Sequence, residues 1–418
     1  MSKKTEHCDI LIIGSGLAGL AASFFATNKG KTIIQTGNTS SLQFHSGFFD
    51  IMAVHPVQTN QVWENPWEGI DKLRQDNSNH PYAFLTKEQL LKAFGKWFEF
   101  LSQLNIHYHY LKDQNIPAIT TIGTQKMTHA VPKCIWTGIS AMMQHKKALL
   151  VDFEGLKGFS GKQIKETLSQ AWPELETIRI SFPETSGELH AAHLANALES
   201  ESTQKLLVNT ILARAQTFDY IGFPSILGGH HHLTVCENIE KMIGKPVFEI
   251  PTLPPSMPGI RLRNALTYGL TQKGVQLCQK TVNQVEPDGK YGFIAHMGDN
   301  KIFAKKIILA AGRFMGKGLI ANRKTIEEPL FNLPLHQPES RREWHQKHFF
   351  SSAGHEIHQA GVRVDQSFRP VGNDNRVINE NLYAIGSILS HNDWMRHKCG
   401  SGVAIGSAFG AISHIDSL

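Results

Sequence analysis

Three glycines near the N-terminus have the spacing of a phosphate-binding loop. Gly14, Gly16 and Gly19 follow the apolar segment "CDILII" and open the small, apolar segment "LAGLAASFFATNKG". Between a strand and a helix, the first glycine permits a tight turn, the second lets the backbone approach a phosphate, and the third lets helix and strand pack closely. The helix start also offers free N–H groups to an anion. This context favours a nucleotide-phosphate site over an ordinary glycine turn.

Two glycine segments late in the chain extend the pattern. Residues 306–314, "KIILAAGRF", place a hydrophobic strand before Gly312, and residues 382–387, "LYAIGS", end a second strand at Gly386. With the N-terminal loop, they resemble the two-dinucleotide-binding-fold flavoproteins. The resemblance implies that the N-terminal loop binds flavin phosphates and that the C-terminal strand and helix close over the isoalloxazine ring.

A glycine-rich turn, "HKCGSGVAIGSAFGAISHI", opens the last expected helix. Its N–H groups and positive dipole end would lie close to a ligand and would favour the negative charge of a reduced flavin. Gly400 and Gly402 are the candidates for that contact, and an amphipathic helix with a glycine start is the alternative. The predicted cofactor-binding residues are therefore Gly14, Gly16, Gly19, Gly312, Gly386, Gly400 and Gly402.

The second strand of the N-terminal unit lacks the acid that usually binds an adenosine ribose. "KTIIQTGN" places Gln35, Thr36, Gly37 and Asn38 in that position. FMN needs no ribose contact of this kind, so the segment favours FMN. Gln35 and Asn38 could still bond a ribose, which keeps FAD as the alternative.

Polar residues gather just before the C-terminal glycine turn. Asp393, His397 and Lys398, with His391 beside them, are the candidate catalytic residues, and a surface position is the alternative. The histidines of "HYHY" and "GGHHHL" have no Cys or carboxylate at ligand spacing, so no metal site is predicted. Five scattered cysteines without a C-x-x-C pair argue against a disulfide framework, an iron–sulfur cluster or structural zinc, and they favour a cytoplasmic protein.

Length and charge limit the class of protein. The chain has 418 residues and 41% hydrophobic content, enough for two domains. A net charge of +6 without a basic run does not indicate nucleic acid, and it suits an anionic small substrate or an acidic partner. No uninterrupted apolar run of membrane-spanning length occurs, so we expect any membrane association to come through a partner.

The expected elements give an α/β fold with a parallel sheet. Residues 8–36 read as strand, helix and strand, and residues 85–104 as an amphipathic helix. A second alternation of strands and helices runs from residue 147 to residue 251. Pro251–Pro258 is expected to be a rigid crossing between domains. The sequence therefore predicts a Rossmann-like flavin-binding domain of residues 1–50 and 251–418, with an inserted second α/β region of residues 51–250.

The proline-rich stretch at residues 250–266, "IPTLPPSMPGIRLRNAL", is the most specific feature. With "GSGLAGL", "FHSGFFDIM", "HPY" at His80–Tyr82, "AAGRFMGKGLIANR", "LYAIGSIL" and the turn at Asp393–Gly402, it resembles the B subunit of anaerobic glycerol-3-phosphate dehydrogenase over essentially the whole chain. Arg313 departs from the small residue expected there. Arg261, in "GIRLRN", could bind a substrate phosphate, and packing at a domain joint is an equal alternative.

The resemblance implies a flavin subunit, described for the family as using FMN, that joins a larger FAD-bearing A subunit. A third, iron–sulfur, membrane-associated subunit would pass electrons to quinone. The implied reaction is oxidation of glycerol 3-phosphate to dihydroxyacetone phosphate, at the inner membrane through the partner subunits. Two alternatives stay open: another flavin-dependent oxidoreductase of the same fold, and a non-catalytic flavin-bearing subunit that relays electrons.

Overall fold

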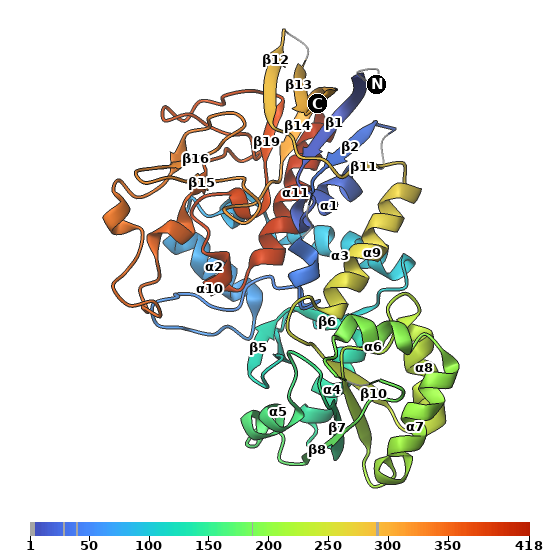
Figure 1. Cartoon of the computed structure of the whole chain (residues 1–418). Coiled ribbons are helices and arrows are strands. Elements are labelled where there is room, and N and C mark those ends of the chain that lie inside the picture. Colours follow the sequence, from blue (N-terminus) through green and yellow to red (C-terminus); the bar gives the residue numbers. More distant parts are fainter. Residues whose placement is uncertain (1–4, 28–29, 39–40, 186, 290–291) are drawn as a thin grey trace. The chain divides into compact units, whose positions relative to one another are not determined.

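The computed structural model describes residues 5–27, 30–38, 41–185, 187–289 and 292–418. The chain forms two compact units, each with its own sheet (Figure 1). Unit 1 comprises Met1–Ser41, Phe49–Phe100 and Leu266–Leu418, and unit 2 comprises Leu42–Phe48 and Leu101–Ala265.

The sheet of unit 1 is built around β1, an apolar strand that is buried along its second half. β1 (Thr5–Ile13) runs parallel to β2 (Ile33–Thr36) on one side and to β14 (Asn300–Leu309) on the other, with Ile13 opposite both Thr36 and Leu309. The order is β11-β2-β1-β14-β13-β12, and β19 pairs with the end of β14. The remaining strands of this sheet are β11 (Gln276–Cys278), β12 (Gln284–Asp288), β13 (Gly292–Met297) and β19 (Leu382–Ala384).

Two helices rich in small residues pack together in unit 1. α1 (Leu17–Ala26) is buried along nearly its whole length and lies against α11 (Gly400–Ser417). Alanine and glycine on both helices allow this close approach. The ring of Phe24 on α1 stacks on Phe100 of α3 (Lys87–Gln103), with centroids 4.3 Å apart. The other helices and short strands of unit 1 are α2 (Pro66–Asp76), α10 (Trp394–His397), β15 (Ile320–Ala321), β16 (Ile326–Glu327), β17 (Leu335–His336) and β18 (Gly361–Val362).

Unit 2 contains the second parallel sheet, in the order β10-β9-β7-β8. Its central strand β7 is buried at every position, as expected for a strand covered on both faces. Its strands are β7 (Ala148–Phe153), β8 (Leu175–Ile180), β9 (Tyr220–Pro224) and β10 (Val247–Ile250). Two separate antiparallel pairs are formed by β3 (Tyr108–Tyr110) with β6 (Ala130–Pro132) and by β4 (Ile116–Ile119) with β5 (Gln125–Thr128).

Helices alternate with these strands in unit 2, which agrees with the predicted βα alternation. They are α4 (Lys133–Met143), α5 (Gly161–Leu168), α6 (Ala191–Ala197), α7 (Glu201–Ala215), α8 (His232–Ile243) and the first part of α9 (Met257–Gln272). The α/β class and the Rossmann-like first domain are confirmed.

The domain boundaries differ from the predicted ones. Residues Phe49–Phe100 belong to unit 1 because backbone hydrogen bonds tie their first segment to the C-terminal turn. The N–H groups of Ala53 and Val54 both donate to the carbonyl of His397, at 3.1 Å. At the other boundary the division falls at Ala265, inside α9, so the predicted proline crossing, Pro251–Pro258, lies within unit 2.

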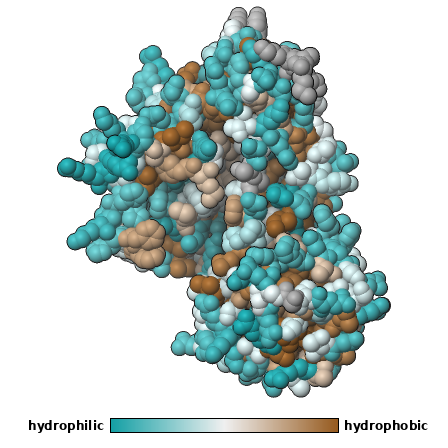
Figure 2. All heavy atoms as spheres, viewed as in Figure 1, coloured by the Kyte–Doolittle hydropathy of each residue, from teal (hydrophilic) through white to brown (hydrophobic). Residues whose placement is uncertain are grey.

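Hydrophilic side chains cover most of the face shown in Figure 2, and hydrophobic ones form scattered patches. Among the helices of the described residues, none is both long enough and apolar enough to cross a bilayer.

Candidate functional site

The N-terminal glycine loop of unit 1 requires glycine at two positions. Gly14 has φ +135°, and a Cβ there would lie 2.1 Å from the carbonyl oxygen of Ala310 on the strand side. A Cβ on Gly19 would lie 2.1 Å from the carbonyl oxygen of Gly14. These contacts keep β1, α1 and the end of β14 in close approach, as the sequence predicts.

The start of α1 is open to an anion. Its N-cap is Gly16, which provides no side-chain cap, and the first turn has no acidic residue. A Cβ on Gly16 would lie 3.3 Å from Ser41 Oγ, so the backbone here is closely approached from one side. A helix start with free N–H groups and no carboxylate fits a phosphate.

The end of β2 holds the loop together. Gln35 is buried, its Nε2 donates to the carbonyl of Gly14 at 2.8 Å, and its Oε1 accepts from Ser23 Oγ at 2.9 Å. One N–H and the oxygen of the Gln35 amide are thus engaged inside the unit, and a bond from Gln35 to a ribose stays a prediction. Asn38, the other residue considered, is exposed.

Gly312 and Gly386 both lie at strand ends with positive φ, +71° and +77°. A Cβ on Gly312 would lie 3.6 Å from Ser387 Oγ. The Gly386 N–H donates to Ser407 Oγ at 2.9 Å, and a Cβ on Gly386 would lie 2.5 Å from the Cβ of Ala18. Gly386 thus keeps the end of β19 in contact with α1 and α11.

The start of α11 is only partly available to a ligand. Its N-cap, Cys399, makes no side-chain cap, and no acidic residue lies in the first turn. The Gly402 N–H, however, donates to the carbonyl of Asp50 at 2.7 Å, and a Cβ on Gly402 would overlap the Tyr82 hydroxyl. The prediction that the Gly402 backbone contacts the cofactor is not supported, because that N–H is already used. Gly400 remains at the open first turn, beside the ring of Trp394.

Arg313, the departure noted in the sequence, binds four backbone carbonyls. Its Nε donates to Ser387, its Nη2 to Leu389 and Asn392, and its Nη1 to His358. Burial lowers the pKa of Arg313 to about 10, so the guanidinium stays charged at neutral pH. The side chain thus fixes the loop after β19 and, with it, the position of Asn392.

That loop brings together a buried polar cluster, defined here as His80, Asn392, His397 and Cys399. A ring nitrogen of His80, a ring nitrogen of His397 and the Cys399 sulfur all lie within 4.8 Å of one another. The Cys399 thiol donates to Asn392 Oδ1 at 3.5 Å. His80 and Asn392 are 0% exposed and His397 is 6% exposed.

Three polar atoms of this cluster have no hydrogen-bond partner among the described residues: His80 Nε2, Asn392 Nδ2 and His397 Nδ1. His80 also caps a short 3-10 turn, Pro81–Phe84, where its Nδ1 accepts from the N–H of Tyr82 at 3.1 Å. A ring whose Nδ1 accepts must carry its proton on Nε2. The Asn392 oxygen, which accepts from the thiol, has a second lone pair, and the Asn392 side chain raises the pKa of His80 against the effect of burial, but no acceptor lies within hydrogen-bond distance of His80 Nε2 among the described residues.

Burial keeps the cluster neutral. It lowers the pKa of His80 well below the usual value, and His397 lowers it further. Burial also lowers the pKa of His397 to about 4, against an opposing effect of Asp393. For Cys399, burial raises the pKa, so the thiol stays protonated. A neutral set of donors beside a neutral imidazole can bind an uncharged oxygen and accept one proton from it.

The other predicted catalytic residues are engaged differently. Asp393 is buried at the N-cap of α10, where Oδ1 accepts from the N–H of Arg396, and Oδ2 lies 3.6 Å from His358 Nδ1. Lys398 is half-buried and has φ +53° at the C-terminal end of α10. The structure therefore brings His397 into the cluster and leaves Asp393 in a capping position.

Arg261 lies in unit 2 and is paired internally. Its Nη1 and Nη2 bind the two carboxylate oxygens of Glu249 at 2.6 and 2.9 Å, and its Nε donates to the carbonyl of Gly228 at 2.9 Å. Glu249 also accepts from the N–H of Leu227 at 2.8 Å. The prediction that Arg261 binds a substrate phosphate is not supported, because the side chain is buried and every nitrogen has a protein partner.

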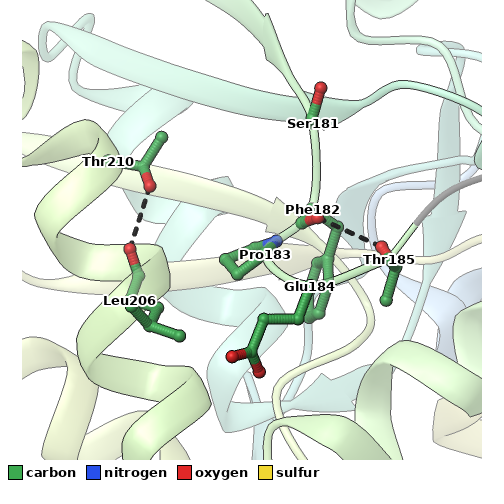
Figure 3. Close-up of a pocket in the computed structure, with 7 residues that line it drawn as sticks. All are labelled: Ser181, Phe182, Pro183, Glu184, Thr185, Leu206 and Thr210. Atoms are coloured by element: carbon green, nitrogen blue, oxygen red, sulfur yellow. Dashed lines mark hydrogen bonds between the residues drawn. The ribbon is translucent and has the colours of Figure 1, made fainter.

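The histidine motifs considered for metal binding lie in unit 2. His109 stacks on Trp136 with ring centroids 3.7 Å apart, and His231 pairs with Glu199 at 2.9 Å. A surface hollow of about 560 Å³ in the same unit is lined by Ser181, Phe182, Pro183, Glu184, Thr185, Leu206 and Thr210 (Figure 3). Its two threonine hydroxyls donate to local carbonyls, and it contains none of the predicted site residues.

Comparison with known proteins agrees with this geometry. Residues 9–403 match the FAD binding domain family, which spans the glycine loop, the β14 and β19 ends and the start of α11. A flavin-binding protein of Rossmann-like fold is therefore the class that the fold and the site define.

The relatives then specify the family. The B subunit of the anaerobic glycerol-3-phosphate dehydrogenase of Vibrio vulnificus (strain CMCP6) is 30% identical, over 98% of this chain and 96% of that one. The corresponding B subunit of Aliivibrio fischeri (strain MJ11) is 29% identical, over 97% and 95%. The chain belongs to the family of anaerobic glycerol-3-phosphate dehydrogenase B subunits. A solved 3-ketosteroid Δ1-dehydrogenase from Sterolibacterium denitrificans aligns at TM-score 0.44 and 11% identity over 99% of this chain and 100% of that one, a likeness too small to carry an inference.

His80, Asn392 and Cys399 were not among the predicted site residues. His80 appears in the motif "HPY", where a histidine before proline can cap a short helical turn, yet nothing local indicates its contact with residue 392. Asn392 lies between His391 and Asp393, which drew attention because they titrate. A search for short polar side chains beside the candidate base would have found it.

Proposed function

We propose that this chain is the flavin-bearing B subunit of an anaerobic glycerol-3-phosphate dehydrogenase and takes part in oxidising sn-glycerol 3-phosphate to dihydroxyacetone phosphate. One observation carries the proposal: in a flavin-binding fold, the buried cluster of His80, Asn392 and His397 includes Cys399, the N-cap of α11, whose first turn is partly available to a ligand. The whole-length relation to the B subunits supports the choice of substrate.

The residues of unit 1 fit a flavin. The loop at Gly14 and Gly16 leads into an uncapped helix start, which suits the phosphate, and Gly400 stands at a second uncapped start, which suits the electron-rich edge of the ring. A bound flavin supplies the two-electron acceptor for a hydride from the substrate carbon. The chain's own task is then to bind the substrate oxygen, exclude water and take up a proton.

We propose FMN as the flavin, on the evidence of β2 alone. Gln35 is committed to Gly14 and Ser23, and no carboxylate stands among residues 33–38, so an adenosine ribose would have no charge-assisted bond. The matched family is described by FAD and supports FAD instead. Heat release of the flavin, followed by chromatography, separates the two: stoichiometric FAD would refute FMN.

Partners complete the proposal. The names of the relatives identify them as subunits, so we propose a complex with an FAD-bearing A subunit and an iron–sulfur subunit at the inner membrane, which would carry the electrons to quinone. The expected result of purifying the tagged chain from its native host is co-purification of both partners. Isolation of the chain alone, at full flavin content and with quinone activity, would contradict it.

A second function is favoured by one observation. Because Arg261 is paired with Glu249, the basic residue predicted to bind substrate phosphate is used inside unit 2. A subunit that only relays electrons would need no phosphate ligand.

An anaerobic titration decides between the two functions. If the chain itself oxidises substrate, glycerol 3-phosphate should bleach the flavin absorbance of the isolated, flavin-loaded chain, and glycerol 2-phosphate, the matched control, should not. Bleaching that appears only after the A subunit is added would establish the relay function.

A further inference from the structure

The buried cluster in unit 1 has the form of an oxygen-binding site. Within the described part of unit 1, His80 Nε2 and Asn392 Nδ2 are fully buried donors without an acceptor. Leaving a donor unsatisfied in a protein interior costs free energy, so such atoms are kept where a ligand completes them. Both donors therefore indicate a ligand that brings an acceptor.

Each donor is held in a fixed orientation by its own second hydrogen bond. The Nδ1 of His80 is fixed by the N–H of Tyr82, which sets the Nε2–H tautomer. The Oδ1 of Asn392 accepts from the Cys399 thiol, and its backbone carbonyl accepts from Arg313 Nη2 at 2.8 Å. Two neutral donors arranged in advance in a site closed to water are what a developing oxyanion requires.

His397 adds a proton acceptor to the same space. Its Nδ1 is also without a partner among the described residues, and its ring centroid lies 5.7 Å from that of His80 and 5.5 Å from that of His55. His55 in turn binds the partly exposed Asp76 at 2.9 Å. A neutral imidazole can take the hydroxyl proton, and the ring of His397 lies next to a second buried histidine whose partner, Asp76, is partly exposed.

A metal centre is disfavoured by the tautomer of His80. A metal would need the lone pair of Nε2, but Nδ1 already accepts from a backbone N–H and the neutral ring has only one lone pair to give. The ring nitrogen of His80 that does not accept from the backbone is thus a donor. An oxygen acceptor matches it, and a cation does not.

We propose that His80 and Asn392 donate hydrogen bonds to the reacting oxygen of an alcohol substrate, and that His397 takes the proton of its hydroxyl group. The O–H bond breaks with its proton going to His397 Nδ1, and the C=O bond forms as the C–H bond gives up a hydride, for which a bound flavin would be the two-electron acceptor. His80 and Asn392 become catalytic residues in this assignment, and Arg313 is a positioning residue. The assignment rests on the proposed function, which supplies the substrate alcohol.

The test uses the full chain loaded with its flavin and the ketone product, dihydroxyacetone phosphate labelled with ¹³C at its carbonyl. Two donors on the carbonyl oxygen polarise the bond, so the infrared carbonyl stretch should move to lower frequency on binding. His80→Asn keeps an N-cap acceptor but withdraws the ring N–H, and Asn392→Leu removes the amide donor with a side chain of similar shape that carries no ionisable group. Each variant should lose much of the shift and bind the ketone about tenfold to a hundredfold more weakly.

Two controls separate this loss from damage to the fold. His129→Asn changes an equally buried histidine of unit 2 and should leave the shift and the affinity as they are. A ligand without the reacting oxygen, 3-hydroxypropyl phosphate, should bind the wild-type chain and the His80→Asn variant equally, within about a factor of two.

The outcomes separate the two claims. If the ketone binds with its shift intact in both variants, the oxygen site is overturned and the proposed function stands; an Asn392 amide turned toward His80 would give this result. If the wild-type chain neither binds the ketone nor is bleached by the alcohol, both are overturned. One equivalent of zinc that depends on Cys399 would overturn the oxygen site in favour of a metal centre.

Discussion

Two buried polar clusters, one in each unit, differ in how completely their hydrogen bonds are made. In unit 2, Glu249 and Arg261 satisfy each other, and the Leu227 N–H and the Gly228 carbonyl complete the set. In unit 1, His80, Asn392 and His397 leave three atoms without partners among the described residues. A cluster whose hydrogen bonds are all made within the protein stabilises the fold. A cluster with polar atoms that have no protein partner is arranged to bind a ligand.

The two clusters also differ in charge: the cluster of unit 2 is an ion pair, and the histidines of the cluster in unit 1 are neutral. Burial alone raises the pKa of Glu249, but the ion pair with Arg261 outweighs it and leaves the pKa below its usual value. The pair is therefore fully charged at neutral pH. His80 and His397 have no such counter-charge strong enough to offset burial, so both are neutral.

The largest expected effect comes from breaking the saturated cluster. Arg261→Met leaves the Glu249 carboxylate buried without its counter-charge, so the free energy of unfolding of unit 2 should fall by about 3–5 kcal/mol. Urea unfolding followed by circular dichroism measures it. Arg263→Met is the matched control, since Arg263 is half-buried and its Nη2 donates to the side chain of its neighbour Asn264. Equal losses in the two variants would contradict a structural role for the pair.

Arg313→Met should have the next largest effect. Four carbonyls lose their donor, and the loop that carries Asn392 is released, so the free energy of unfolding should fall by about 2–3 kcal/mol. The exposed Arg323→Met serves as the control. A variant that keeps full stability and full product affinity would show that Arg313 does not position the cluster.

The histidine of the cluster predicts a pH dependence. The folded pKa of His397 is about 4 and the unfolded value is about 6.5, so between these values the unfolded chain binds a proton that the folded chain does not. Stability therefore falls as the pH is lowered through this window, by about 2 kcal/mol at pH 5 for one group. The groups that act on the ring are Asp393, His55 and Arg396, with His80 packed beside it.

His397→Asn should remove this contribution. Unfolding in urea at pH 7 and at pH 5 should then show a smaller difference for the variant than for the wild-type chain. His345→Asn, at an exposed position, is the control. An unchanged pH dependence in His397→Asn would mean that the ring is charged in the folded chain.

The smallest change in stability is expected for the two donors themselves. His80→Asn and Asn392→Leu remove hydrogen-bond donors that have no partner among the described residues and add no charge, so the free energy of unfolding should change by less than about 1 kcal/mol. Thermal unfolding of the flavin-loaded chain gives the value. A loss as large as that of Arg261→Met would place the unit 1 cluster among structural features and remove the contrast.

Local sequence patterns predicted what depends on neighbours along the chain. The glycine loop, the strands on either side of it and the alternation in unit 2 follow from periodicity and glycine spacing, and all were found.

Long-range pairing could not be predicted in this way. The hydrogen bond from Gly402 to Asp50 joins residues far apart in the chain and engages the N–H that was predicted to contact the cofactor. Arg261 shows the same limit: its type suits a phosphate, but its partner, Glu249, is set by the crossing of β10 and α9. Spacing alone does not tell whether a charged side chain is free or already paired.

Hydrogen–deuterium exchange of the flavin-loaded chain, with and without dihydroxyacetone phosphate, tests the contrast between the clusters most directly. We expect slower exchange on ligand binding in peptides that cover residues 77–84 and 390–402, and no change in those that cover residues 247–261. Protection confined to residues 247–261, or absent from residues 77–84 and 390–402, would contradict the contrast.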